Sequence, residues 1–272
     1  MKGKKVLIIM LTVLVFLSGT VLGVSSAYRI DAVLVDAKTV SVEAETEAEA
    51  LKKRLIEVYE KQFTPFATEE EAYAVVEEFP YFRITAVEKA YPNRLIVRVT
   101  EDDEVYAVSC GENSDNYYIL NREGTVLGIR NDYLNRSDET GKAKNVLITG
   151  VSVSGEKGEK ISGDEALSYL FTVCAKADEL LQGIRRNVLT IEKIQAGSSA
   201  DTVTLKLTTF EGVKIYINTP SEKAEEKAQA AIETYLSLSD GARTRGMIAV
   251  AEVDGTVKAF HADKDAFDTM NA

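Results

Sequence analysis

The stretch VEKAYPNRLIVRVTEDDEVYAV, residues 87–108, contains two strand-like runs on either side of a turn. Pro92 and the asparagine after it break the first run, because proline fixes its own φ and asparagine tolerates turn geometry. After the turn, the apolar residues Leu95, Val97 and Val99 occupy every second position. A period of two is typical of a strand with one buried face. The stretch therefore predicts a β-hairpin.

Two helices are predicted ahead of this hairpin. A threonine followed three residues later by a glutamate is a capping box, a common signal for a helix start, and the pattern occurs at Thr46 and at Thr68. The first predicts a helix that continues to about Phe63, and the second predicts a shorter helix. A strand-like run at residues 28–36 precedes both. The predicted order over residues 28–101 is strand, helix, helix, strand, strand.

The second half of the chain is predicted to be rich in strands. Ser162 and Thr219 begin two more capping-box patterns, which predict helices that run to about residues 181 and 239. Asp254-Gly255 is the strongest two-residue hairpin signal. The strand-like runs cover residues 105–110, 117–121, 125–130, 145–153, 188–194, 202–208, 213–217, 247–253 and 256–261.

The N-terminal part of the sequence predicts a membrane anchor. Residues 6–24 carry no charge, and 19 residues of helix reach about 28 Å, close to the thickness of the hydrocarbon core. Lysines at positions 2, 4 and 5 predict that residues 1–5, ahead of the uncharged run, stay in the cytoplasm. A cleaved signal peptide ending at the small residues 25–27 is the alternative. Both interpretations place residues 28–272 outside the cytoplasm.

Charge and residue types argue against several functions. The net charge is −11, and without the three N-terminal lysines it is −14 for residues 28–272. Such an acidic domain does not suit nucleic acid, which requires a basic face. The chain has one histidine, His261, and neither a nucleophile elbow nor a glycine-rich phosphate loop. We therefore expect no enzyme activity, no metal and no cofactor.

Two other features have open interpretations. The acidic run at residues 101–104 would need several converging oxygens to bind a cation, so a solvated turn between domains is the favoured interpretation. His261 is expected to be a surface residue, because no second histidine or cysteine lies near it. Export permits a disulfide between Cys110 and Cys174, but two buried thiols are an equal alternative.

Three stretches together resemble the bacterial cell-division protein family FtsQ/DivIB. ITAVEKAYPNRLIVRVTEDDEVYAV at residues 84–108 is similar to the end of the family's POTRA domain and its link to the next domain. NYYILNREGTVL at residues 116–127 and VTLKLTTFEGVKIYIN at residues 203–218 are similar to two later hairpins. The order and spacing of the three stretches carry the resemblance, which extends from the anchor to about residue 261.

The resemblance implies a single-pass type II membrane protein at the division septum. Its expected parts are a membrane-proximal POTRA domain and a β-rich second domain, with no enzymatic activity. It would act as a scaffold of the divisome, support septal peptidoglycan synthesis and bind bitopic division proteins like FtsL and FtsB/DivIC. The sequence differs from the family pattern at two places. Asp103-Glu104 stands where the family commonly has a proline, and Asp36-Ala37 stands where the family frequently has a Gly-Asn pair.

These observations together predict an α+β protein with a single N-terminal transmembrane helix. The POTRA domain would be β-α-α-β-β, and the second domain would be mainly antiparallel with flanking helices. The predicted parts are residues 1–5 (cytoplasmic), 6–24 (transmembrane), 28–101 (POTRA), 105–262 (β-domain) and 263–272 (polar tail). An exported or anchored binding module, in which a POTRA-like domain serves protein assembly or export, is the alternative function.

The final hairpin is the predicted interaction site. A strand at the edge of a sheet has unpaired backbone groups, so it is either protected or accepts a partner strand. In the resembled family, partner binding lies at this C-terminal end of the sheet. An outward lysine there is also a common protection against pairing. The residues expected to receive a strand of an FtsB/DivIC-like partner are Thr256, Val257, Lys258, Ala259 and Phe260.

Overall fold

The computed structural model describes residues 10–16, 18, 23, 27–60, 62–111, 114–136, 138, 142–195 and 203–266. Residues 1–5 and most of the predicted transmembrane segment, residues 6–24, lie outside this set. No helix within these described ranges is long and apolar enough to cross a membrane, so the transmembrane helix stays a prediction. The chain divides into two compact units, Met1–Asp102 (unit 1) and Asp103–Ala272 (unit 2).

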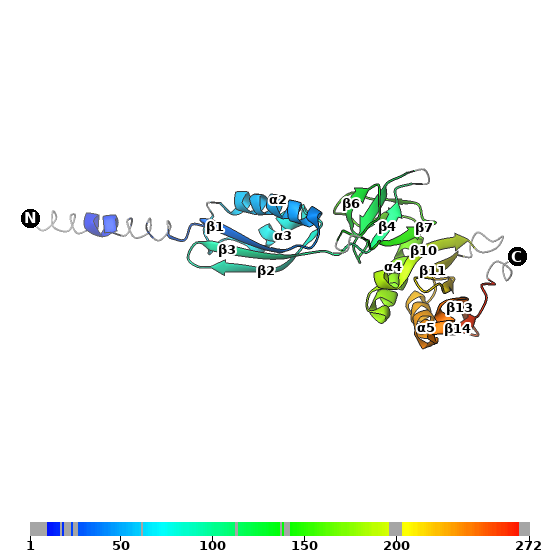
Figure 1. Cartoon of the computed structure of the whole chain (residues 1–272). Coiled ribbons are helices and arrows are strands. Elements are labelled where there is room, and N and C mark those ends of the chain that lie inside the picture. Colours follow the sequence, from blue (N-terminus) through cyan, green and yellow to red (C-terminus); the bar gives the residue numbers. More distant parts are fainter. Residues whose placement is uncertain are drawn as a thin grey trace, which may run out of the picture. The chain divides into compact units, whose positions relative to one another are not determined.

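Unit 1 is a three-stranded sheet with two helices packed on it (Figure 1). The strand order is β1-β3-β2, with β1 parallel and β2 antiparallel to β3. The predicted order of elements and the hairpin are confirmed, and Leu95, Val97 and Val99 are buried. The elements are β1 (Ala32–Lys38), α2 (Val42–Tyr59), α3 (Glu69–Glu77), β2 (Phe82–Ala90) and β3 (Arg94–Glu101).

One of the two helix starts predicted in unit 1 is wrong. The capping box at Thr68 is present, but α2 begins at Val42, four residues before Thr46. The hydroxyl of Ser41 caps this helix, and the Glu101 carboxylate from β3 accepts the backbone N–H of Ser41 at 2.9 Å. Thr46 lies inside α2, where its hydroxyl donates to the carbonyl of Val42 at 2.9 Å. A contact from another element therefore sets the start of this helix.

Unit 2 is built on a nine-stranded mixed sheet in the order β14-β13-β12-β11-β10-β7-β4-β5-β6. Its elements are β4 (Tyr106–Ser109), β5 (Tyr117–Leu120), β6 (Val126–Arg130), β7 (Val146–Thr149), β8 (Val153–Ser154), β9 (Ser162–Gly163), α4 (Ala166–Leu181), η1 (Ile184–Arg186), β10 (Val188–Gln195), β11 (Val203–Thr209), β12 (Lys214–Asn218), α5 (Ala224–Ser237), α6 (Asp240–Arg243), β13 (Met247–Val253) and β14 (Thr256–Ala262). The parallel pairs are β4 with β7, β7 with β10, and β12 with β13; the other pairs are antiparallel. The predicted α+β class and mainly antiparallel sheet are confirmed.

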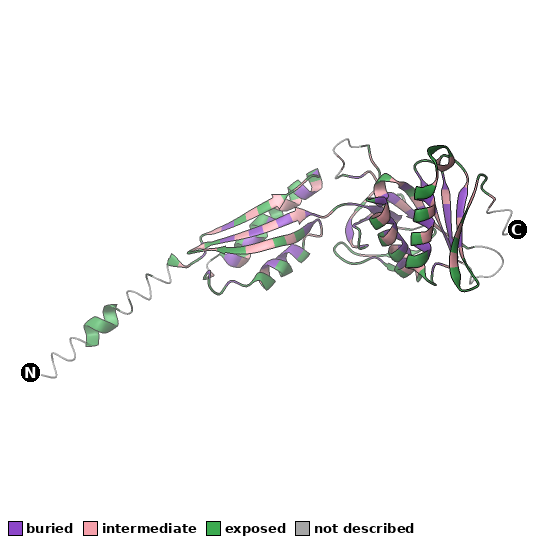
Figure 2. Cartoon of the chain, turned by 90° about the horizontal axis from the view of Figure 1, so that it is seen from below, coloured by how far each residue is buried: buried purple, intermediate pink, exposed green. Residues whose placement is uncertain are grey.

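The main core of unit 2 lies between this sheet and the helices α4 and α5. Side chains such as Leu170 of α4, Ile232 of α5, Leu207 of β11 and Ile248 of β13 belong to one buried apolar cluster. Figure 2 shows exposed residues on the outer surface of the helices and buried residues along the strands. The helix α5 packs against α4 and against β12, β13 and β14.

The capping boxes predicted at Ser162 and Thr219 are both wrong. Ser162 pairs in β9, and α4 begins at Ala166, whose N–H donates to Asp164 at 2.8 Å. The Lys193 ammonium on β10 holds the same carboxylate, with both of its oxygens at 2.8 Å. The ion pair therefore fixes Asp164 as the residue that caps α4.

The start of α5 is also set by a contact outside the local pattern. Thr219 and Lys223 both adopt left-handed backbone conformations, with φ of 46° and 52°, and the helix begins only at Ala224. The buried ammonium of Lys227 donates to the carbonyl oxygens of Asn218 at 3.0 Å and Thr219 at 2.7 Å. These bonds fix the turn that the capping box was expected to occupy.

Candidate partner-binding edge

The strand β14 forms one end of the nine-stranded sheet, so its outer side has no neighbouring strand among the described residues. Its register with β13 runs from Val253 opposite Thr256 to Met247 opposite Ala262. The turn between them is Asp254-Gly255, with φ of 54° and 76°. Positive φ at both positions is the type I′ turn that suits a two-residue hairpin. The predicted hairpin is therefore confirmed and lies at an edge of the sheet.

The turn determines which backbone groups of β14 are free. Pairs in an antiparallel ladder alternate between those that exchange hydrogen bonds and those whose N–H and C=O groups point away from each other. In a two-residue hairpin the residues that flank the turn bond to each other, so Thr256 bonds to β13. By alternation, Lys258 and Phe260 also bond to β13. The N–H and C=O groups of Val257 and Ala259 therefore point to the outer side of the sheet.

The side chains of β14 divide between the two faces of the sheet. Val257 and Ala259 pack against the main core on the side covered by α5. Thr256, Lys258 and Phe260 are exposed, and the phenylalanine ring is 57% exposed. A partner strand that pairs with the free backbone groups could also pack a side chain against this exposed aromatic ring.

Lys223, just before α5, supports this hairpin, and Lys227 in α5 holds the turn that follows β12. The Lys223 ammonium is 3.0 Å from the carboxylate of Glu252 on β13 and 2.9 Å from the carbonyl of Gly255 in the turn. Lys227 is only 1% exposed, and its burial lowers the pKa of its ammonium. Sequence reasoning missed both residues. A signal for Lys227 existed, because it has helical spacing with the buried residues Ala231 and Tyr235.

The residues after β14 cross the sheet away from its free edge. The carboxylate of Asp265 accepts hydrogen bonds from the Tyr216 hydroxyl at 3.1 Å and from the Lys214 ammonium, both on β12. Ala266 packs beside Tyr216 and Met247. Residues 263–272 were predicted to be a polar tail, and the described part, residues 263–266, is attached to the sheet. Because Asp265 reaches β12, this part leads away from the outer side of β14.

The acidic run at residues 101–104 is not brought together at one site. The predicted solvated turn is wrong for two of its residues, because Glu101 belongs to β3 and is 8% exposed and Glu104 is fully buried. Glu101 accepts the N–H of Ser41 before α2, Asp102 is 3.8 Å from the Arg83 guanidinium, and Glu104 pairs with Arg130 at 2.8 Å. Among the described residues, no group of three or more His, Cys, Asp or Glu side chains lies close enough to hold a metal ion.

The histidine and the cysteines lie apart from any such cluster. His261 is half-buried rather than fully exposed, and its Nε2 is buried without a hydrogen-bond partner. Both cysteines are free thiols. Burial raises the pKa of the Cys174 thiol to about 12, and it also raises the pKa of the Cys110 thiol. A high thiol pKa makes a poor nucleophile at neutral pH.

Three hollows in the described surface are small. Their volumes are about 200, 220 and 220 Å³, below the ~300–1,000 Å³ of a usual small-molecule site. The first is lined by Arg122, Arg185 and Asp178, and the second by Leu189 and Phe210 among others. The free backbone edge of β14 is therefore a better candidate for binding than these three hollows.

Comparison of the chain with protein-family models found no matching family. Comparison with curated protein sequences also found no significant match.

Proposed function

We propose that this chain is a non-catalytic scaffold of the bacterial divisome, anchored in the cell membrane as a single-pass type II protein. In this proposal residues 6–24 cross the membrane, and both units lie outside the cytoplasm at the division septum. The proposal is supported by the order and spacing of the FtsQ/DivIB-like stretches in the sequence. It is also supported by the strand, helix, helix, strand, strand order of unit 1.

The observation that carries the binding part of the proposal is the free outer side of β14. A small bitopic partner, similar to FtsL or FtsB/DivIC, would add a strand there and receive main-chain hydrogen bonds from Val257 and Ala259. Each such bond contributes about 0.5–1.5 kcal/mol net. Phe260 and Lys258 would contact alternate side chains of the added strand and provide selectivity.

The outward N–H of Ala259 allows a direct test of strand addition at β14. Ala259→Pro removes an outward N–H and is compatible with an edge strand, where proline is tolerated on the solvent side. We expect this variant to bind the extracytoplasmic segment of an FtsB/DivIC-like partner at least about tenfold more weakly, a loss of about 1.4 kcal/mol. Ala259→Val is the matched control, because it enlarges the same side chain and keeps the outward N–H. Unchanged affinity of a folded Ala259→Pro variant would rule out strand addition at β14.

The cellular role has a separate test. A fluorescent fusion of the full chain should concentrate at the division septum. An even distribution around the cell envelope would contradict the divisome role and would favour the alternative of a general assembly or export module.

A further inference from the structure

One end of unit 1 gathers three segments that are far apart in the sequence. They are the entry of the chain at Tyr28, the loop between α2 and α3, and the β2–β3 turn. Thr64, in the loop, is fully buried and joins them. Its N–H donates to the Tyr28 carbonyl at 2.9 Å, and its hydroxyl lies 3.1 Å from the same oxygen and 2.7 Å from the Pro92 carbonyl.

This end exposes aromatic rings that the core of unit 1 does not use. Tyr28 and Tyr91 pack edge to face with ring centroids 6.2 Å apart, and Phe63 and Phe66 do so at 6.5 Å. Phe66 is 79% exposed and Tyr91 is 60% exposed. We call these four residues the aromatic end. Tyrosine is enriched at the membrane–water interface, and phenylalanine is common on the faces of interfacial helices that enter the boundary between headgroups and acyl chains.

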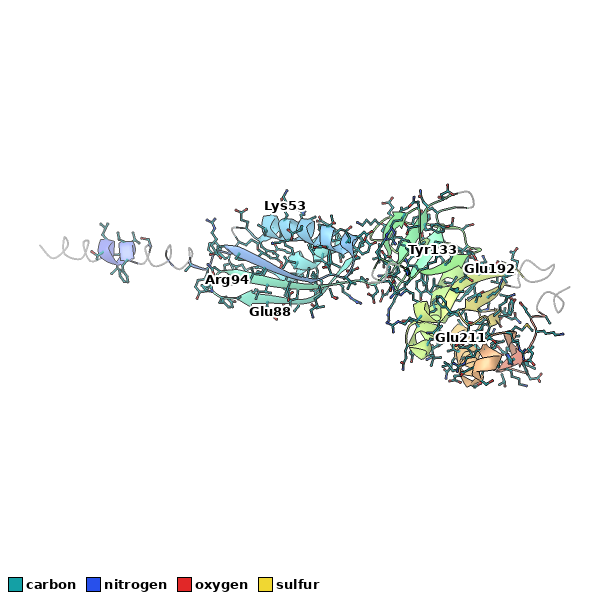
Figure 3. The ribbon with its side chains drawn as sticks, in the orientation of Figure 1. Lys53, Glu88, Arg94, Tyr133, Glu192 and Glu211 are labelled. Carbon is teal, nitrogen blue, oxygen red and sulfur yellow. The ribbon has the colours of Figure 1, made fainter. Side chains whose placement is uncertain are left out.

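The charges at this end have both signs. Arg29, Lys89 and Arg94 lie on its segments, and the Lys89 ammonium donates to the Pro65 carbonyl at 3.2 Å. Figure 3 shows Arg94 at the end of unit 1 where the chain enters. Several acids lie on the same or adjoining segments: Asp31, Glu60, Glu69, Glu70 and Glu71. Attraction to anionic lipid is therefore not the main force, and the rings determine the expected binding.

The position of the aromatic end in the chain limits its distance from a membrane. The uncharged run ends at Val24, four residues before Tyr28. Four residues span at most about 14 Å when fully extended. The polar interface on each side of a bilayer is about 5–8 Å thick. A chain anchored through residues 6–24 therefore holds the aromatic end at or near the lipid headgroups.

We propose that the aromatic end docks into the lipid–water interface, with Phe66 and Tyr91 inserted among the headgroups. The proposal rests on the membrane anchor of the proposed function, but not on the divisome role. Within unit 1, α2 runs from the opposite end toward the aromatic end. Its 18 residues correspond to about 27 Å. Docking would therefore hold the start of α2, at Val42, well above the membrane surface.

The absence of tryptophan from the chain makes a direct test available. Phe66→Trp places a single tryptophan at the aromatic end, and Val42→Trp places one at the far end of α2, where the native side chain is 74% exposed. Each full-length variant is reconstituted into phosphatidylcholine vesicles, with and without bromine on the lipid acyl chains. We expect the emission of Trp at position 66 to shift to the blue and to be quenched by the brominated lipid. The control at position 42 should show neither effect.

The possible outcomes separate the two parts of the proposal. A chain that does not sediment with the vesicles overturns the anchor and the docking together. A chain that sediments while both variants remain unquenched overturns the docking and leaves the anchor standing. Quenching at both positions overturns docking by the aromatic end alone, because unit 1 would then lie along the membrane.

Discussion

The carboxylate of Glu101, at the end of β3, holds the N-cap residue of α2 by accepting the backbone N–H of Ser41 at 2.9 Å. The same oxygen accepts the N–H of Val40. Glu101 is only 8% exposed, so water cannot readily replace it. A negative charge at a helix N-terminus also interacts favourably with the helix dipole. One side chain thereby joins the sheet of unit 1 to α2.

Replacing Glu101 should loosen α2. We expect Glu101→Ala to lower the free energy of unfolding of unit 1 by about 1–3 kcal/mol, because two backbone N–H groups lose their acceptor. Glu101→Gln keeps an acceptor oxygen and should cost about 1 kcal/mol. Native-state hydrogen exchange of the α2 amides measures both values. Glu49→Gln, at an exposed position of α2, is the control and should change protection by less than about 0.5 kcal/mol.

The ion pair between Asp164 and Lys193 should make the stability of unit 2 depend on pH. Both side chains are largely buried, at 12% and 19% exposure. Burial opposes ionisation of Asp164, but hydrogen bonds from Lys193 and from the N–H of Ala166 more than offset it, so its pKa is lowered. A lowered carboxyl pKa contributes stability above the unfolded pKa, and that stability is lost as pH falls through the folded pKa.

The measurement compares Asp164→Asn with the wild-type chain across this range. At neutral pH the variant should unfold about 3 kcal/mol more easily, because the Lys193 ammonium loses its buried partner. The difference should shrink as pH falls below the ordinary pKa of an aspartate, about 3.9. Glu192→Gln, which removes the more exposed partner of Lys206, is the control. A difference that stays constant over that range would show that Asp164 does not contribute through its charge.

The buried pair of Glu104 and Arg130 should be among the costlier contacts to break in unit 2. The two groups form a bidentate contact at 2.8 and 3.0 Å, and the Glu104 side chain is fully buried. Arg130→Met would leave that carboxylate without its main partner, and we expect a loss of about 3–5 kcal/mol. Arg136→Met removes an exposed pair with Asp132 and should cost less than about 1 kcal/mol. Equal losses in the two variants would contradict this account.

The capping pattern in the sequence located only one of four helix starts. The box at Thr68 is satisfied within its own turn, so local sequence was sufficient there. At Thr46 the helix starts earlier because Glu101, 60 residues from Ser41, supplies acceptors. At Ser162 the capping carboxylate is held by a lysine from β10. Such residues are distant in the sequence, and the fold brings them to the helix start. A four-residue pattern therefore cannot identify them.

The hairpin that forms the candidate binding edge could be predicted from the sequence, but the long-range contacts that stabilise it could not. Alternation and the Asp254-Gly255 turn were sufficient to predict the hairpin, since both signals are local. The place of β14 at the end of the sheet depends on the parallel pairing of β12 with β13 across α5. The type I′ turn determines that the N–H of Ala259, and not that of Lys258, points to the outer side of the sheet. The supports from Lys223 and Asp265 are long-range contacts that no local pattern indicated.

The two thiols should differ strongly in reactivity in the native protein. Cys174 is fully buried in α4 and has a pKa raised to about 12, whereas Cys110 is only half-buried near the end of β4. The thiolate is the reactive form, so iodoacetamide at mildly alkaline pH should label Cys110 slowly and leave Cys174 unmodified until the chain is unfolded. Cys110→Ser should abolish labelling of the native protein without changing the single label gained on unfolding. A mass that shows both sulfurs oxidised before labelling would instead indicate a disulfide, which would require α4 to leave the core that buries Cys174.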